Sequence, residues 1–511
     1  MNEKLGNNDK IITQLRDENH QLCEENAILR KKVDALIRMH FGSKSEKLTP
    51  EQLDLFIDSE EANTPASADS EDEVLAEELK RELRVVPDRK RREPRRLENL
   101  PTIETIITPE EVLKNPEGFR KIGERRSIKL DYSPMSLTQI ILILETYEKK
   151  GEDKTIISAP LPPALLDGSI LTPSLLSNII TAKYCDHLPL YRQAQIFSRR
   201  FEINIPRNTM SDWMEVGADW LKPIYNAMVK ELRGTGYIKV DETPINYLEP
   251  GHGSTKEGKL WIFHNPALKT IIYDWHTSRA AKCLASVLGE GDDAFEGILQ
   301  SDAYSAYKKW ARTHKGIISA GCWAHVRRKF FDALNEDPEL AAKILRLIQR
   351  LYQIEKHIAD SPPEVRRHHR KKQSRPIIKC LYRLINKVKY KHLPKSKLGE
   401  AASYAINQWE KLRIYLFDPQ VDIDNNSCER GVRPTKIGLK NWLFIGGAKT
   451  GWRSAVLYTM VENCKLQGKD PYAYFKWVFE KLPTMTNQDD MLKLTPASWF
   501  ETLLENEKAA A

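Results

Sequence analysis

Two short β-rich runs in this 511-residue chain each end on a carboxylate. The first runs from Gly236 to Asp241, and the second runs from Gly297 to Asp302. Between them lie two more strand-like runs, Lys259 to His264 and Thr270 to Trp275, and a helical stretch from Ser278 to Leu288. The predicted order is β-β-β-α-β, with the first three strands antiparallel and acids closing the first and fourth strands.

This order predicts a ribonuclease-H-like α/β core with a mixed sheet, in which the first and fourth strands lie side by side. Asp241 and Asp302, although 302 − 241 = 61 residues apart, would then meet at one end of the sheet. Hard divalent cations prefer oxygen ligands, and two such ions about 3.5–4 Å apart stabilise both the attacking and leaving oxygens of a phosphoryl transfer. We expect two Mg²⁺ or Mn²⁺ ions, which require a third carboxylate.

Glu429 is the candidate for the third carboxylate. In the run from Asn425 to Lys436, the side chains of Glu429, Arg433 and Lys436 share one face if the segment is helical, because the spacing is i, i+4 and i+7. A glycine and a proline in this run limit its regularity. One carboxylate for metal beside two cations for phosphate fits a DNA-cutting site, although an ordinary surface helix carries the same residue types.

A second region points to DNA. Three helical patterns, Pro173 to Ala182, Leu190 to Phe201 and Arg207 to Trp220, resemble a helix-turn-helix region. Three-helix bundles that do not bind DNA are common, so the pattern alone leaves both alternatives open. The cations that would flank the groove-facing helix are Arg199, Arg200 and Arg207.

The N-terminal part differs in composition from the rest. Leucines recur every seven residues within residues 10–48, which predicts a coiled coil that forms a parallel homodimer; a single amphipathic helix is the alternative. Residues 49–97 are first acidic and then basic, as expected of a linker, and the basic run Arg89 to Arg96 is a candidate phosphate contact. Residues 98–165 contain β-rich runs that suggest a small β-containing module.

Composition sets the class of partner and compartment. Lys plus Arg outnumber Asp plus Glu by 79 to 71, which favours a polyanionic partner. Seven scattered cysteines without a CxxC pair fit reduced thiols in a cytoplasm. No apolar run approaches the length of a membrane span, and the charged N-terminus does not fit a secretory signal, so we expect a cytoplasmic protein with no membrane partner.

Several stretches together resemble the transposases of insertion sequence family sixty-six. They are Phe41 to Leu48, His187 to Gln193, Val240 to Thr243, Ser301 to Tyr307, Gly321 to Phe330, Glu429 to Phe444 and Asp470 to Phe475. They occur in the family's order and account for most of the chain. The resemblance implies a bacterial Asp-Asp-Glu transposase that cuts at the terminal inverted repeats of its element and joins the freed 3′-hydroxyl to target DNA, with companion small proteins encoded beside it.

By matching motif, Asp241, Asp302 and Glu429 inherit the catalytic, metal-binding triad, and Lys436 matches the basic residue placed on terminal nucleotides. The multidomain α+β chain would then divide into a helix-turn-helix-like region (166–230), a catalytic core (231–335 and 420–465), a helical insertion (336–419) and a tail (466–511). The further candidate DNA contacts are Arg430, Arg433, His325, Arg327, Arg328 and Trp442. For Trp442, stacking on a flipped base is weighed against a place in the core.

Zinc is not expected. Relatives usually carry a cysteine-rich zinc module after the linker, but this chain has no cysteine between Cys23 and Cys185. Cys322 and His325 form a C-x-x-H pair, and two ligands do not make a site. We interpret Cys322 as a core residue and expect His325 to approach the acids or the DNA backbone.

Two other functions fit parts of the sequence. A structure-specific nuclease of the same fold would share the acids, but the predicted coiled coil and helix-turn-helix favour an enzyme that recognises defined ends. A catalytically silent dimeric DNA-binding regulator would bind DNA without cutting it, and the presence of all three acids does not favour it.

Overall fold

The computed structural model describes Leu137 and residues 146–148, 156–158, 162–249, 253–302, 304–486 and 490–499. The predicted coiled coil and linker lie outside these residues. The described part of the predicted small module includes an antiparallel pair formed by β1 (Thr146–Glu148) and β2 (Ile156–Ser158). Among the described helices, none combines the length and the apolar character needed to cross a bilayer.

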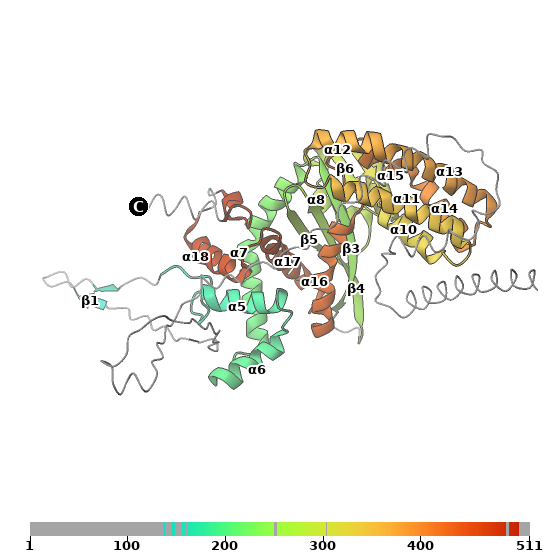
Figure 1. Ribbon diagram of the computed structural model, residues 1–511. Helices are drawn as coiled ribbons and strands as arrows, with labels where there is room; N and C mark the ends of the chain where they lie inside the picture. The colour runs from blue at the N-terminus through green and yellow to red at the C-terminus, as the bar shows by residue number, and fades with distance from the viewer. Residues whose placement is uncertain are drawn as a thin grey trace, which may run out of the picture. The chain divides into compact units, whose positions relative to one another are not determined.

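A five-stranded mixed sheet lies at the centre of the fold, in the order β5-β4-β3-β6-β7 (Figure 1). Its strands are β3 (Tyr237–Leu248), β4 (Thr255–Asn265), β5 (Thr270–His276), β6 (Gly297–Gln300) and β7 (Ile317–Ala320). The first three are antiparallel, whereas β6 pairs in parallel with β3 and β7 in parallel with β6. The predicted strand order is confirmed, including the pairing of the first strand with the fourth. The prediction that Asp241 closes the first strand is wrong, because β3 continues to Leu248 and pairs with β4 along this length.

Helices cover this sheet and extend beyond it. Before the sheet come α5 (Pro173–Tyr184), α6 (Leu190–Phe201) and α7 (Arg207–Arg233); α8 (Ala285–Leu288) and α9 (Ser305–Thr313) connect its strands. After β7 follow α10 (Trp323–Asp332), α11 (Pro338–His357), α12 (Pro363–His369), α13 (Arg375–Lys391), α14 (Lys397–Asn407) and α15 (Trp409–Leu412). The chain then returns to the sheet with α16 (Asn426–Trp442), α17 (Gly451–Leu466) and α18 (Pro471–Lys481).

Two apolar clusters hold these layers together. The larger one joins the sheet to α5, α7, α17 and α18 through fully buried side chains such as Ile238, Met214 and Phe475. The second is built by α10, α11, α13, α14 and α15 and reaches the sheet through Tyr237 and Ile298. Neighbouring residues of β3 thus belong to different clusters, because successive side chains of a strand point to opposite faces.

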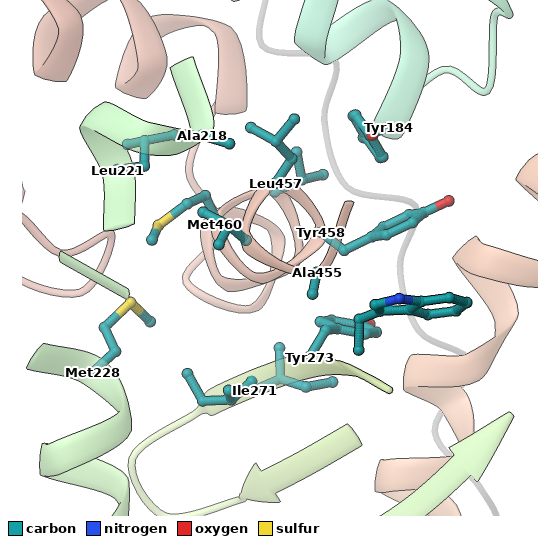
Figure 2. Packing of buried hydrophobic residues seen from close by; sticks show 14 of the residues in the cluster. Tyr184, Ala218, Leu221, Met228, Ile271, Tyr273, Ala455, Leu457, Tyr458 and Met460 are labelled. Carbon is teal, nitrogen blue, oxygen red and sulfur yellow. The ribbon is translucent and has the colours of Figure 1, made fainter. Parts of the chain in front are cut away.

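Helix α17 closes the free edge of β5. The Asn463 side chain accepts from the Ile271 N–H at 3.1 Å and donates to the Ile271 carbonyl at 2.5 Å, while Thr459 Oγ1 accepts from the Tyr273 N–H at 3.0 Å. Tyr225 of α7 donates to the Tyr273 carbonyl at 2.9 Å. Figure 2 shows α17 packed between α7, α5 and β5, with Tyr458 of α17 close to Tyr184 of α5 and Tyr273 of β5. Side chains therefore satisfy the backbone groups that an edge strand leaves open.

One predicted boundary is wrong. The third helix of the helix-turn-helix pattern does not end at Trp220 but continues as α7 to Arg233, through Pro223. Proline in a helix interior removes one hydrogen bond and usually ends or kinks the helix. Here the residues beyond it, including Ile224, Met228 and Leu232, are buried in the larger cluster, and this packing offsets the loss.

We expect Asn463→Leu to destabilise the fold by about 2 to 4 kcal/mol, because two buried backbone groups of Ile271 lose their partners. Urea unfolding followed by circular dichroism measures the change. Asn386→Leu is the control, since that amide donates only to the Tyr382 carbonyl on its own helix. Equal stability of the two variants would contradict this account of the sheet edge.

Candidate active site

The register of β3 and β6 brings two of the predicted acids to one level of the sheet. Tyr237 pairs with Ile298 and Lys239 pairs with Gln300, so partners are 298 − 237 = 61 residues apart. Asp241 and Asp302 have the same separation, and they follow the paired segment by the same two residues. The Asp302 carboxylate accepts from the Tyr304 N–H at 2.9 Å, which fixes its direction after the strand ends.

The third predicted acid lies on a helix that is tied to the same strand. The buried Lys239 ammonium donates to Asp422 at 2.7 Å, to the Asp424 carbonyl at 2.9 Å and to Ser427 Oγ at 2.8 Å. Asn425, which precedes the helix, donates its side-chain N–H to the Val240 carbonyl at 3.0 Å. These bonds join the start of α16 to the residues just before Asp241.

Glycine lets α16 approach the sheet closely. A Cβ added to Gly431 would lie 2.6 Å from Cδ1 of Ile271, and the Gly431 carbonyl accepts from Tyr273 Oη at 2.8 Å. The helix runs unbroken through Pro434, contrary to the irregularity expected from the sequence. Glu429, Arg433 and Lys436 therefore lie on one continuous helix with the i, i+4 and i+7 spacing considered in the sequence analysis.

The three acids interact electrostatically. Burial, the largest cause, and the negative charges of Glu242, Glu429 and Asp302 together raise the pKa of the Asp241 carboxyl to about 8, against one hydrogen bond from the Glu242 N–H that lowers it. A carboxyl group with this environment is held protonated near neutral pH unless a cation offsets the neighbouring charges. The structure thus places Asp302 and Glu429 near enough to Asp241 for their negative charges to act on it.

The donors of this cluster fit a metal ion. Glu429 Oε1 is buried without a hydrogen-bond partner, and His325 Nδ1, buried and equally unpartnered, lies 3.7 Å from it. Oxygen ligands of this kind suit hard divalent cations. His325 therefore does approach the acids, as predicted, and Cys322 is buried, as predicted; burial raises the pKa of the Cys322 thiol to about 12.

Sequence reasoning missed a second polar network on the opposite face of β3. Glu242 is almost fully buried, accepts from Arg279 Nε at 2.7 Å and also accepts from Tyr307 Oη. The Arg279 guanidinium lies 3.5 Å from the centre of the Tyr304 ring. The signal was present: Glu242 directly follows Asp241 on a strand, so its side chain must point to the other face.

The predicted basic residues fall into three groups. On α16, Arg430 and Arg433 are exposed, whereas Lys436 is partly buried and donates to the Pro244 carbonyl at 2.8 Å. Arg327 and Arg328 lie on α10, one turn beyond His325. The third group, at the end of α6 and the start of α7, is exposed, and among the described residues no hydrogen bond or ion pair joins it to the acids; it comprises Arg199, Arg200 and Arg207.

Trp442 lies at the end of α16, partly buried against the larger apolar cluster. Its ring faces Tyr184 in an edge-to-face contact, with centroids 6.4 Å apart, and the Lys183 ammonium lies 5.4 Å from its centre. It also lines a small cavity of about 60 Å³ that Arg453 shares, which is room for a few water molecules only. This packing favours a position for the Trp442 side chain at the boundary of the apolar core.

Comparison with known proteins defines the class to which this fold and cluster belong. A protein-family model described as "Transposase IS66 family" matches residues 168–452, which is 285 of the 511 residues (452 − 168 + 1). Models described as "IS66 C-terminal element" and "Transposase C of IS166 homeodomain" match residues 459–505 and 28–104. The chain is therefore a transposase-type protein encoded by an insertion sequence, and it belongs to the IS66 transposase family.

Relatives in Sinorhizobium fredii support this assignment. "Uncharacterized protein y4jD" is 32% identical over 419 residues, which cover 78% of this chain and 81% of the relative. "Uncharacterized protein y4qI" is 31% identical over 507 residues, which cover 95% of this chain and 89% of the relative. The resemblance noted in the sequence is confirmed, and family membership implies a function in DNA transposition.

The raised pKa of Asp241 predicts how stability depends on pH when no metal is present. The folded carboxyl binds its proton up to about pH 8, whereas an unfolded one loses it near pH 4, so the free energy of unfolding falls as pH rises between these values. From pH 6 to 8 the loss is about 2 kcal/mol. Asp241→Asn removes this dependence and stabilises the chain at pH 8.

Urea unfolding in EDTA at pH 6 and pH 8 measures how the free energy of unfolding changes with pH, for the wild type and for Asp241→Asn. Asp332→Asn, which changes an exposed carboxylate at the end of α10, is the control and keeps the wild-type slope. If Asp241→Asn kept the wild-type slope too, burial and the neighbouring charges would not raise the pKa of Asp241 as described.

Removing the buried ammonium should loosen the start of α16. We expect Lys239→Met to cost about 3 kcal/mol, because three oxygens lose their shared donor in a place with little water. Lys259→Met, on the neighbouring strand, removes an ammonium that pairs with the exposed Glu257 and should cost less than about 1 kcal/mol. Chemical denaturation of the two variants, side by side, tests this difference, and equal losses would refute it.

Proposed function

We propose that this protein is an Asp-Asp-Glu transposase that cuts DNA at the ends of its insertion sequence and joins the freed 3′-hydroxyl to target DNA. In the first step water attacks the scissile phosphorus and the P–O3′ bond breaks, leaving a 3′-hydroxyl and a 5′-phosphate. In the second step that hydroxyl attacks a target phosphodiester and displaces its 3′-oxygen. Family membership and the acid cluster support this proposal.

The observation that carries the proposal is the convergence of Asp241, Asp302 and Glu429 from three separate segments. Asp241 lies on β3 and Asp302 follows the adjacent parallel strand β6 in the same register, and the third acid stands on a helix held to β3 by Lys239 and Asn425. We assign this sheet and helix to a ribonuclease-H-like catalytic core. A surface carboxylate would not need such anchoring, whereas a metal-binding one must be held within a fraction of an ångström.

The three carboxylates would hold two Mg²⁺ or Mn²⁺ ions, which supply positive charge to the attacking and leaving oxygens of the phosphoryl transfer. The chain's own part is to gather the ligands. The charges on Glu429 and Asp302 already raise the pKa of Asp241, so the cluster favours the cation that relieves their repulsion.

The basic residues near the acids suit a phosphate backbone. We assign Arg430, Arg433 and Lys436 on α16, together with His325, Arg327 and Arg328 on α10, to the strand that is cut, because both helices begin beside the acids. Trp442 and the exposed arginines Arg199, Arg200 and Arg207 are assigned to DNA farther from the cut, with the latter three in a helix-turn-helix-like region at 166–230.

Assembly of two element ends requires at least two copies of the catalytic chain, since both ends must be cut together. We assign dimerisation to the coiled coil predicted at 10–48, and we expect companion small proteins of the same element to take part. The catalytic core would span 231–335 and 420–465, interrupted by the helical insertion at 336–419. These domain boundaries are the ones predicted from the sequence.

The decisive experiment is cleavage of a duplex that carries the element's own terminal repeat, with Mg²⁺, Mn²⁺ or EDTA. We expect Glu429→Gln to lower cutting by a factor of about 10³ or more, since a metal ligand of the reacting phosphate is lost. Glu410→Gln, which changes an exposed carboxylate on α15, is the matched control and should cut like the wild type.

The outcomes separate the candidate functions. Cutting that needs both the metal and Glu429 supports the transposase, and integration of the cut end into a plasmid distinguishes it from a structure-specific nuclease. Sequence-dependent binding without cutting under any metal, even with the companion proteins added, would favour the catalytically silent regulator instead.

A further inference from the structure

Three different metal-binding side chains meet beside the acid cluster. One ligand atom each of Cys322, His325 and Glu429 lies within 4.8 Å of the others. The first two come from the start of α10 and the third from α16, which is 429 − 325 = 104 residues later in the chain. The sequence shows only the C-x-x-H pair, so the third ligand becomes visible only when the two helices are brought together.

The positions of these side chains are fixed by the backbone around them. Cys322 is the N-cap of α10, and its Sγ accepts from the Asn425 N–H at 3.3 Å. Asn425 in turn binds the Val240 carbonyl of β3, so the thiol, the sheet and α16 are linked. His325 follows on the first turn of α10, where its Nδ1 lies 3.7 Å from Glu429 Oε1.

Two of the three groups lack partners that their burial requires. His325 Nδ1 and Glu429 Oε1 are both shielded from solvent, and among the described residues neither makes a hydrogen bond. Buried polar atoms are nearly always paired, and an unpaired one carries a desolvation cost. A cation between the imidazole, the carboxylate and the thiol would satisfy both atoms at once.

The ligand set selects the kind of metal. Sulfur and imidazole suit borderline-soft ions, and a set of one Cys, one His and one carboxylate leaves the fourth position of a tetrahedral Zn²⁺ open. Mg²⁺ requires octahedral oxygen ligands and does not take a thiolate. This set therefore differs in preference from the three-carboxylate cluster, although the two sets share Glu429.

We propose that Cys322, His325 and Glu429 form a Zn²⁺ site that competes with the catalytic use of Glu429. Zn²⁺ displaces the thiol proton of Cys322, which leaves to solvent, and the resulting thiolate binds the metal. A carboxylate engaged in this way no longer completes the acid cluster. The site makes DNA cutting sensitive to zinc, and only this inhibitory consequence rests on the proposed function.

The binding test uses Co²⁺ as a spectroscopic probe for Zn²⁺ on the full chain. We expect tetrahedral d–d bands and a thiolate-to-cobalt charge-transfer band, both removed by added Zn²⁺. Cys322→Ser should abolish the charge-transfer band and weaken binding by about tenfold or more. Cys283→Ser is the matched control, because that cysteine is also buried and hydrogen-bonded to a backbone group, the Ser278 carbonyl, but lies outside the cluster.

The cobalt spectra of the wild type and of Cys322→Ser either support the metal site or overturn it. A charge-transfer band that survives Cys322→Ser, or no such band in the wild type, overturns it, and His325→Ala should lower the affinity without removing the band. These spectra need no DNA, so they stand even if the chain does not cut.

The inhibition test compares wild type and Cys322→Ser in Mg²⁺-dependent cutting of the terminal repeat with increasing Zn²⁺. We expect the variant to cut normally without zinc and to need about tenfold more Zn²⁺ for half-inhibition. Equal sensitivity of the two proteins would overturn the competition, while the metal site itself is judged by the cobalt spectra.

Discussion

The buried ammonium of Lys239 is the interaction on which the geometry of the acid cluster depends. It sits on β3 between Tyr237 and Asp241, and its three oxygen partners belong to the segment that leads into α16 and to the first turn of that helix. A lone buried cation would be unstable, so the segment must stay in place as long as the fold persists. The third acid is therefore placed by the sheet, even though 429 − 241 = 188 residues separate it from the first.

The two faces of β3 divide the polar side chains by role. Asp241 points to the face that receives α16, where carboxylates with few partners accumulate and repel one another. Glu242 points to the other face, where Arg279 and Tyr307 donate hydrogen bonds to it. These two adjacent acids thus differ in role. Asp241 is left available for a ligand, whereas Glu242 is neutralised by Arg279 and, through Tyr307, holds the start of α9 against the sheet.

Much of the core could be predicted from the sequence because strand order follows from short apolar runs. The 61-residue separation of Asp241 and Asp302 equals the register of β3 and β6, although Asp241 lies within β3 and not at its end. The position of Glu429 near Asp241 needed the resemblance, since no local pattern reports a contact between segments that helices α10 to α15 separate in the sequence. The full length of α7 was missed because Pro223 looks like a helix end, whereas tertiary packing overrides it. The roles of Arg279, Lys239 and Asn425 could not be foreseen, because each depends on a partner from a distant segment.

The closed edge of β5 has a consequence for how copies of the protein can associate. Hydrogen-bonding groups of Ile271 and Tyr273 that a neighbouring strand would use are already occupied by side chains of α7 and α17. Pairing of two sheets through β5 would first require α17 to leave its place in the larger apolar cluster. Copies of the protein therefore cannot pair through β5 while α17 stays in place, and the same closed edge protects the chain from growing into intermolecular β-structure at that side when many copies are made.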